Sequence, residues 1–326
     1  MATNFTTSNQ KGLREDLANY ISNISRDMTP FTASIGKGKA SQTLHEWSTD
    51  TLETAGLQAA AEGSSFAESA SPVVTRIGNR TQIFTKGIRV SGTLETVDKA
   101  GRKSEFKYQT EKRGKEMSRD VEKTLLSSQV STASVTAGAA TTTVKQGARL
   151  MAGYQAWAGV AVDASSGTLT QASGDGSDVA TVSGGTAAAF TLDQINEVLR
   201  SVNGVTSAAP SRVMMSTAQK VDFSNLINAG TGTNVRRNID ENGKLRQSVD
   251  LYESDFGDVE VVHNYLMDNT EIFVYDPSLL SVATLRPIHF RDINEDGDSL
   301  RSYMVQELTL EAKNPAGNGI IVGTTT

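Results

Sequence analysis

Apolar residues recur with helical or strand spacing in only a few parts of the first third of the chain. Near the N-terminus a short amphipathic helix is predicted, with one apolar face made by Leu13, Leu17, Tyr20, Ile21 and Ile24. Pro30 is expected to end any helical run there, because proline has no amide hydrogen to donate.

Residues 46–92 are rich in small and polar side chains and poor in apolar clusters. Near the end of this segment Phe84, Ile88 and Val90 alternate with polar residues, which predicts a strand. The rest has too little apolar content to form a core of its own, and such long coreless excursions are unusual inside a compact monomer. We therefore expect the segment to lie on a neighbouring molecule.

One long helix of about 25 to 30 residues is predicted within residues 94–129. Asp98 with Arg102 and Glu111 with Lys115 are oppositely charged pairs at helical spacing, and the apolar stripe is sparse. Glycines at 101 and 114 are expected to bend or delay this helix. Because most of its surface is charged, such a helix is expected to line or bridge a surface and not to fill a core.

The second half predicts an α+β fold whose strand partners lie far apart in the sequence. Residues 130–190 have a Ser, Thr, Gly and Ala bias that favours loops and short strands. Two helices follow, each opened by a capping box: Thr191 with Gln194, and Ser216 with Gln219. Residues 240–244 form a hairpin-type turn pattern, and residues from 259 onward predict four strands.

Composition excludes several classes of function. The 326 residues carry a net charge of −6, so a broad basic surface for gripping nucleic acid is not expected. The absence of cysteine excludes disulfides, thiolate zinc sites and cysteine nucleophiles. The polar start has no signal-peptide core, and no stretch is apolar enough for a membrane helix, so we expect a soluble protein made in a cytoplasm.

No motif predicts catalysis, a cofactor or a bound metal. The three histidines, His45, His263 and His289, are dispersed and lack zinc-ligand spacing. Residues 35–39 resemble a phosphate loop only superficially, because the Gly-Lys-Ser/Thr ending is missing. Residues 292–298 match the start of a calcium loop, but its twelfth position is Tyr303, which cannot act as the bidentate carboxylate. A polar turn between strands is the favoured interpretation.

Several segments, in order from residue 5 to about residue 323, resemble the major capsid (major head) proteins of tailed bacteriophages. They are FTTSNQKGLREDLANYISNISRDMTPFTASIGKGKA, LHEWSTDTL, VSGTLETVDKAGRKSE, RDVEKTLLSSQ, MAGYQAW, DLYESDFGDVEVVHN, TLRP and GDSLRSYMVQELTLEAKNPAGNGII. The resemblance is weakest over residues 55–70 and 160–190, which vary among relatives.

The resemblance implies a Hong Kong 97-like capsid fold. Its parts would be an N-terminal arm (1–45), an extended loop (46–92), a peripheral domain with a spine helix (93–130), an axial domain (131–280) and peripheral C-terminal strands (281–326). It also implies a structural protein and not an enzyme, which self-assembles into the hexamers and pentamers of an icosahedral head enclosing double-stranded DNA. The virion would be assembled in the bacterial host cytoplasm.

The partners implied by this resemblance are other copies of the chain, a portal, a decoration protein and a scaffolding protein, the last expected as a separate chain. DNA contact would be weak and non-specific, in line with the acidic balance. Contact between subunits is expected through residues of the loop and the start of the spine helix, with ion pairs from the loop to the adjacent spine helix. The candidates are Trp47, Glu62, Phe66, Glu68, Arg76, Arg80, Lys99, Arg102 and Lys103.

Two other functions stay open from the sequence. A phage tail, decoration or surface protein would also fit the Thr/Ser/Gly-rich middle, although such proteins seldom need a long charged helix. A soluble enzyme would require a site that no motif indicates.

Overall fold

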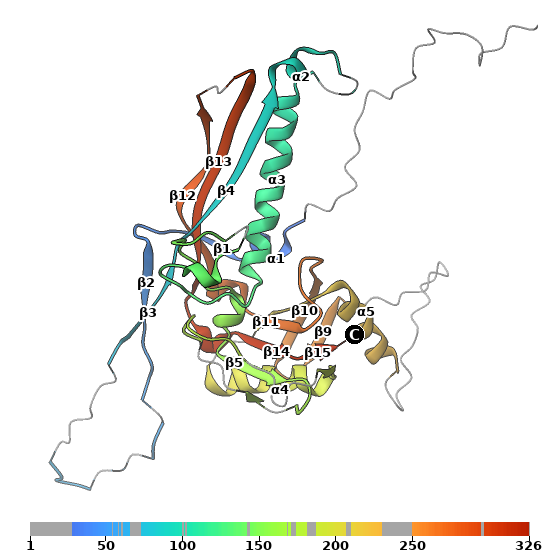
Figure 1. Ribbon diagram of the computed structural model, residues 1–326. Helices are drawn as coiled ribbons and strands as arrows, with labels where there is room; N and C mark the ends of the chain where they lie inside the picture. The colour runs from blue at the N-terminus through green and yellow to red at the C-terminus, as the bar shows by residue number, and fades with distance from the viewer. Residues whose placement is uncertain are drawn as a thin grey trace, which may run out of the picture.

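The computed structural model describes residues 28–53, 55–57, 59, 61–65, 73–99, 101, 103–141, 144–167, 169–170, 174–180, 187–206, 210–229, 250–294 and 297–325. The predicted N-terminal helix and the hairpin-type turn at 240–244 lie outside these residues. Two sheets with separate helices dominate the fold (Figure 1).

The first sheet has four strands in the order β1 (Gly36–Lys39), β12 (Leu280–Ile293), β13 (Ser299–Ala312) and β4 (Gln82–Ser91). β1 is parallel to β12, and the other neighbours are antiparallel. α3 (Glu105–Leu125) packs along β4 and touches β13 (Figure 1). The predicted alternation of β4 is confirmed, because Phe84, Ile88 and Val90 are buried on the side that faces the helix.

The predicted long helix is α3, and its delay beyond Gly101 is confirmed. With 21 residues it is shorter than predicted, and a separate short helix, α2 (Gly92–Thr96), precedes it. Gly101 between them has φ of 78°, a conformation that a continuous right-handed helix does not contain. Ser104 then caps α3 by accepting a hydrogen bond from the Lys107 amide at 3.2 Å.

The second sheet has seven strands. Their order is β6 (Leu169–Thr170), β5 (Val160–Asp163), β14 (Gly319–Val322), β11 (Glu271–Tyr275), β8 (Arg212–Met215), β10 (Gly257–His263) and β9 (Leu251–Ser254). α4 (Leu192–Val205) packs on β5 and β14, and α5 (Thr217–Ala229) packs on β10. β15 (Thr324–Thr325) pairs with β7 (Ala188–Ala189) beside this sheet. Four 3-10 turns complete the described elements: η2 (Ala137–Ala139), η3 (Tyr154–Ala156), η4 (Pro277–Leu279) and η5 (Pro315–Gly317).

Both predicted capping boxes are confirmed. The Gln194 side chain accepts from the Thr191 amide at 3.0 Å, and the Gln219 side chain accepts from the Ser216 amide at 2.9 Å. The strands predicted after residue 259 are confirmed as β10, β11, β12 and β13.

The C-terminal segment 281–326 does not stay in one sheet. β12 and β13 lie in the four-stranded sheet, whereas β14 returns to the seven-stranded sheet between β5 and β11. The run Gly319–Val322 is buried throughout, as expected for a central strand covered on both faces.

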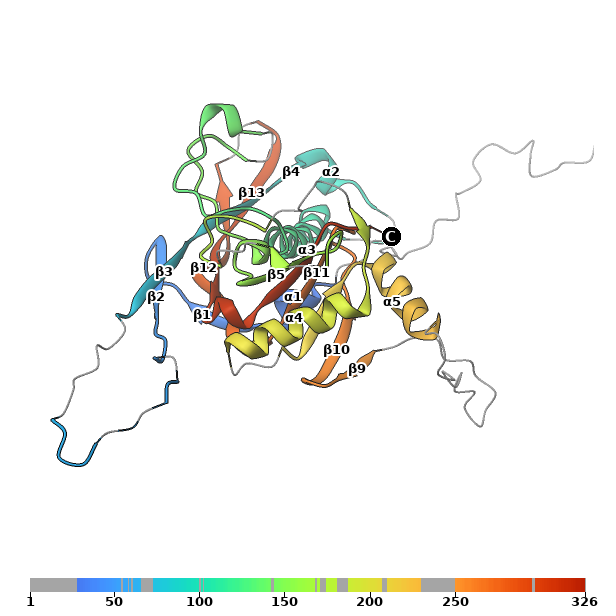
Figure 2. The ribbon, with the colours of Figure 1, turned by 90° about the horizontal axis from the view of Figure 1, so that it is seen from below.

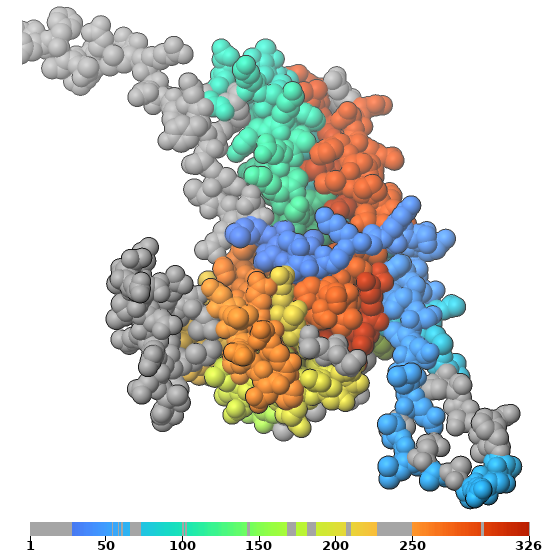
Figure 3. Space-filling model, turned by 180° about the vertical axis from the view of Figure 1, so that it is seen from behind, coloured from blue at the N-terminus to red at the C-terminus, as the bar shows by residue number. Residues whose placement is uncertain are grey.

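Residues 28–40 form a strap between the two sheets. Pro30 begins α1 (Pro30–Ser34), where its fixed φ suits the first helical position and its missing amide costs nothing. The helical run that Pro30 was expected to end lies outside the described residues. In Figure 3 this strap, in dark blue, crosses the back of the molecule between α3 and the region of the seven-stranded sheet. Phe31 is fully buried in the core that joins α3, the four-stranded sheet and Trp157. A second core lies between α4, α5 and the seven-stranded sheet.

β2 (Leu44–Thr49) and β3 (Thr75–Arg80) form a two-stranded ribbon that leads into a projecting loop (Figures 1 and 2). The expectation that this part has no core of its own is confirmed for the described residues, since Leu52 and Leu57 are almost fully exposed. The segment 46–92 is not all projection, however, because β4 at its end is a strand of the four-stranded sheet.

Candidate assembly surfaces

The base of the β2–β3 ribbon is fixed to the body of the protein. Trp47 on β2 packs at a tilt against the fully buried Trp157, with ring centroids 5.1 Å apart and an interplanar angle of 44°. The buried Asn79 on β3 donates to the Leu310 carbonyl at 2.8 Å and accepts from the Ala152 amide at 2.8 Å. The projecting loop therefore starts from a rigid support.

A second anchor at this base is the carboxylate of Glu307 on β13. It accepts hydrogen bonds from the Thr81 hydroxyl at 2.7 Å, from Arg149 at 2.6 Å and from Arg286 at 2.8 Å, and its side chain is only 4% exposed. Burial alone raises the pKa of Glu307, but these hydrogen bonds and the nearby guanidinium charges outweigh it, so the pKa lies below its ordinary value. The cluster ties the turn between β3 and β4 to β12 and β13.

The strap is held by Glu122, near the end of α3. Its carboxylate accepts from the amides of Phe31 and Thr32 at 2.7 and 2.8 Å, from the Thr32 hydroxyl, and from the Asn264 side chain at 2.7 Å. Glu122 and Asn264 are both fully buried. A side chain of α3 thus caps α1 and also reaches the loop after β10, so one group joins three parts of the fold.

Hydrogen bonds that cap the end of α2 and the start of α3 hold the tip that these two helices form. Glu95 accepts from the amides of Glu105 and Phe106, and its pKa is lowered first by the hydrogen bond from the Ser104 side chain and then by these amides. The Lys99 ammonium donates to the carbonyls of Leu94, Glu95 and Val97, the last two at 3.0 Å. These contacts close the end of the short helix α2.

The candidate contact residues differ in their surroundings. Trp47 and Lys99 make contacts within their own chain, as described above. Arg76 is exposed and lies 3.9 Å from Glu46 on the paired strand, while the amide of the half-buried Arg80 donates to Asn79. Glu62 and Lys103 are exposed. Phe66, Glu68 and Arg102 lie outside the described residues.

The structure brings these candidates to two separate places, the projecting ribbon and the α2–α3 tip, and not to one site. Sequence reasoning missed Glu122, Glu307 and Asn79. Their partners lie up to 231 residues away along the chain, so no local pattern marks them. The sequence offers one signal for Glu122. This residue directly follows Val121 and so lies at the edge of the apolar stripe of α3.

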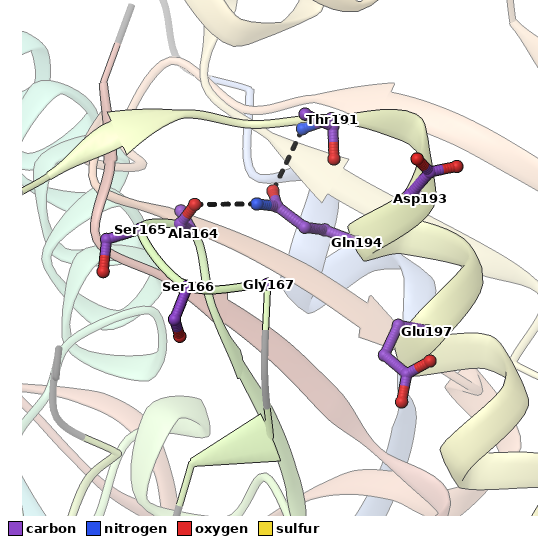
Figure 4. A pocket seen from close by; sticks show the side chains of 8 residues that line it. All are labelled: Ala164, Ser165, Ser166, Gly167, Thr191, Asp193, Gln194 and Glu197. Carbon is purple, nitrogen blue, oxygen red and sulfur yellow. Dashed lines mark hydrogen bonds between the residues drawn. The ribbon is translucent and has the colours of Figure 1, made fainter.

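One polar hollow lies beside the start of α4 (Figure 4). It is lined by Ala164, Ser165, Ser166, Gly167, Thr191, Asp193, Gln194 and Glu197. The Gln194 amide that reaches into it is already bonded, accepting from Thr191 and donating to the Ala164 carbonyl at 2.8 Å. Nothing here pairs a nucleophile with a base.

The described part of the chain holds no group of three or more histidine, aspartate or glutamate side chains placed to bind a metal ion. Nor does any helix in it combine the length and the apolar character needed to cross a membrane.

Comparison with known proteins identifies the family. The sequence matches the family described as SU10 major capsid protein over residues 1–325. The chain belongs to this family. It is therefore a major capsid protein of a phage, a structural component of the virion and not an enzyme. This assignment also excludes the alternative of a tail, decoration or surface protein.

A sequence relative of this capsid protein is the major capsid protein of Escherichia phage Phieco32. The two are 41% identical over 131 residues, which is 40% of this chain and only 37% of the relative. Among solved structures, the capsid of cyanophage A-1(L) is similar with a TM-score of 0.67 at 13% identity, covering 98% of this chain and 99% of that one. The capsid of a native GTA particle is similar with a TM-score of 0.65 at 11% identity, covering 99% and 100%. The fold is of the Hong Kong 97 type, as the resemblance implied.

Proposed function

We propose that this capsid protein forms hexamers and pentamers that close an icosahedral shell around double-stranded DNA, assembled in the cytoplasm of a bacterial host. The observation that carries this proposal is the projecting loop. Leu52, Leu57 and Val73 are 97%, 108% and 90% exposed, although they are large aliphatic residues.

The exposure of these residues favours an intermolecular contact. Burying one leucine side chain contributes about 1.5–3 kcal/mol, and the described residues of the loop do not supply that burial within the subunit. The loop leaves the ribbon in a direction away from both sheets (Figure 1). A neighbouring copy provides the missing surface, and repetition around a closed shell multiplies modest contacts into a stable assembly.

The parts of the chain would then have separate roles. Residues 1–45 act as the N-terminal arm, of which the strap at 28–40 is the anchored end. Residues 46–81 act as the extended loop, and residues 82–130 with β12 and β13 act as the peripheral domain around α3. The seven-stranded sheet, including β14, acts as the axial domain that meets its copies around a ring.

Other partners follow from the needs of a closed shell. A portal would replace subunits at one vertex, and scaffolding and decoration proteins would guide or reinforce the lattice. The net charge of −6 favours only weak, non-specific contact with packaged DNA.

The test is assembly of the full chain, expressed alone and with the structural proteins of the same phage, followed by size-exclusion chromatography and negative-stain imaging. We expect closed shells, or free hexamers and pentamers. The double variant Leu52→Ser with Leu57→Ser should keep the thermal stability of the subunit and lose most of the assembled material.

Val205→Ser is the matched control, because Val205 is also aliphatic and exposed but lies at the end of α4. Wild-type yields of shells from the double variant would contradict the role given to the loop. A wild-type chain that stays monomeric under every co-expression condition would contradict the assembly itself.

A further inference from the structure

One face of α3 carries a row of cations, although the chain as a whole is acidic. Residues three or four apart in an α-helix share a face, because each residue lies about 100° around the axis from the one before it. The buried side of α3 includes Met117, Val121 and Leu125. The opposite side carries four cations at such spacings, which we call the basic ridge: Lys112, Lys115, Arg119 and Lys123.

The carboxylates of α3 are mostly turned away from this ridge or already paired. Glu105 and Glu122 are buried. Asp120 forms an ion pair at 2.5 Å with a lysine of β4, and Glu116 forms one at 2.5 Å with the arginine three residues before it. Glu111 is exposed, but it lies one residue before Lys112 and therefore about 100° away around the helix axis. The ridge thus keeps an excess of positive charge.

The four cations of the ridge differ in how far they are engaged within the subunit. Lys123 is neutralised by Asp268 at 2.8 Å, and the half-buried Arg119 lies over the ring of Tyr265, 5.9 Å from its centroid. Lys115 is exposed and has a contact in the subunit, but its ammonium carries three donor hydrogens and can bind a further acceptor. Lys112 is exposed and forms no ion pair with any described residue. Figure 3 shows α3 on the surface of the molecule, above the strap.

The spacing of the ridge suits a regular polyanion. Lys112 and Lys123 are eleven residues apart, which corresponds to about 16 Å along the helix axis. One strand of double-stranded DNA presents about five phosphates over that length. Lysine binds phosphate as a point charge without demanding a fixed geometry, so the ridge can contact a DNA backbone of any sequence.

A nucleic acid fits this face better than a protein does. Protein interfaces have an apolar centre and are depleted of lysine. The described residues of α3 include no large hydrophobic side chain that is exposed, so the ridge offers charge alone. Charge alone is sufficient for non-specific binding to DNA, because that binding is driven by the release of counterions from the phosphates.

Exposed carboxylates gather in another part of the subunit. Glu253, Asp255 and Asp258 are exposed in the hairpin of β9 and β10, at one end of the seven-stranded sheet. A polyanion is therefore attracted to α3 and repelled by this hairpin. The acidic net charge of −6 is compatible with a narrow basic contact, because the two signs of charge occupy different elements.

We propose that the basic ridge of α3 contacts the phosphate backbone of packaged double-stranded DNA, through Lys112, Lys115 and Arg119. This inference rests on the proposed function and names the surface that meets the DNA. The contact is weak in each subunit and independent of sequence, and it requires that this side of α3 faces the inside of the shell.

The salt dependence of DNA binding tests the ridge. Binding of unassembled subunits to a short duplex of mixed sequence is measured by fluorescence anisotropy over a range of salt concentrations. In Lys112→Gln with Lys115→Gln, the slope of log affinity against log salt should fall in magnitude by about 1.8, because each lost phosphate contact removes about 0.9. Lys107→Gln with Lys145→Gln is the matched control. It removes the same charge from two exposed lysines off the ridge, and it should leave the slope unchanged. Thermal unfolding confirms that both variants are folded.

Photocrosslinking in DNA-filled heads locates the contact. A photoreactive amino acid in place of Lys112 should give covalent adducts with DNA, whereas the same amino acid in place of Lys107, about 140° around the helix, should give few or none.

Equal salt slopes for the two double variants, or no salt-dependent binding by the wild-type subunit, would overturn the inference. So would adducts at position 112 with protein alone, which would point to an acidic protein as the occupant of the ridge. All of these outcomes leave shell formation intact. Absence of shells from the wild-type chain would instead count against the proposed function.

Discussion

Removing the carboxylate of Glu122 should loosen the strap that joins the two sheets. Its two oxygens accept four hydrogen bonds, from the amides of Phe31 and Thr32, the Thr32 hydroxyl and the Asn264 side chain. The site therefore presents four donors, and the two carboxylate oxygens of Glu122 supply the acceptors that they need.

The expected cost follows from the groups left without a partner. In Glu122→Ala the amide of Phe31 and the side chain of Asn264 lose their acceptor in a fully buried place, and the Thr32 amide loses its acceptor in a half-buried one. Each orphaned donor costs about 1–3 kcal/mol, while the relief of desolvating a buried carboxylate offsets part of the sum. We expect a net loss of about 3–5 kcal/mol in the free energy of unfolding, the range for breaking a buried charged contact.

Glu122→Gln separates charge from shape. The glutamine has the same size but presents one NH₂ group to donors that need an acceptor, so we expect an intermediate loss of about 1–3 kcal/mol. Glu111→Ala is the control, because Glu111 is exposed on the same helix, and it should change stability by about 0.5 kcal/mol or less.

The assay is urea unfolding of unassembled subunits, combined with hydrogen exchange of the Phe31 and Thr32 amides. Both amides should exchange faster in Glu122→Ala, and the unfolding midpoint should fall. A variant within about 1 kcal/mol of wild type, with unchanged protection of these amides, would refute the reasoning that Glu122 is the principal anchor of the strap.

Three further predictions concern single side chains. Trp47→Ala should cost about 2–3 kcal/mol and expose the ribbon to protease, whereas Trp47→Phe should keep much of the packing against Trp157; thermal unfolding and limited proteolysis report both. The pKa of Glu307 is lowered, so its ionised carboxylate stabilises the fold above the ordinary pKa of 4.5, and this stabilisation is lost as the pH falls through the lower folded-state pKa. Glu307→Gln should therefore make the unfolding midpoint less dependent on pH in the acid range. The pKa of Glu271 is raised, mainly by burial, so its ionised form destabilises the fold at neutral pH. Glu271→Gln should then match or exceed wild-type stability at pH 7, and the advantage should vanish below its ordinary value of 4.5. A Glu271→Gln variant that is less stable at pH 7 but not in acid would contradict the sign.

Features that depend on neighbouring residues could be predicted from the sequence. The capping boxes at Thr191 and Ser216 use a partner three residues away, and the alternation in β4 needs only its own ten residues. The coreless loop was visible as well, because a lack of apolar residues is a property of composition. These are the features that a single chain segment determines by itself.

Features that depend on distant partners could not be predicted. Glu122 has the sequence context of an ordinary solvated carboxylate on a charged helix, and only the strap 91 residues earlier gives it a buried role. The delay at Gly101 was expected, but the separate helix α2 was not, because the helical spacing of Asp98 and Arg102 continues the pattern across Gly101, whose positive φ breaks it. That Pro30 begins α1 was not predicted, because proline's missing amide has opposite consequences at the first helical turn and in a helix interior.

Substitutions at the rigid base of the ribbon and at its exposed tip should have different effects. At the base, Trp47, Asn79 and the Glu307 cluster place their polar and aromatic groups against the same chain, so changes there act on the folding free energy. At the tip, Leu52, Leu57, Glu53 and Glu62 are exposed, so changes there should leave the stability of the subunit nearly intact. Assembly and stability should therefore respond to different substitutions within residues 46–81, because the base must hold the loop at a fixed angle before the tip can reach a neighbour.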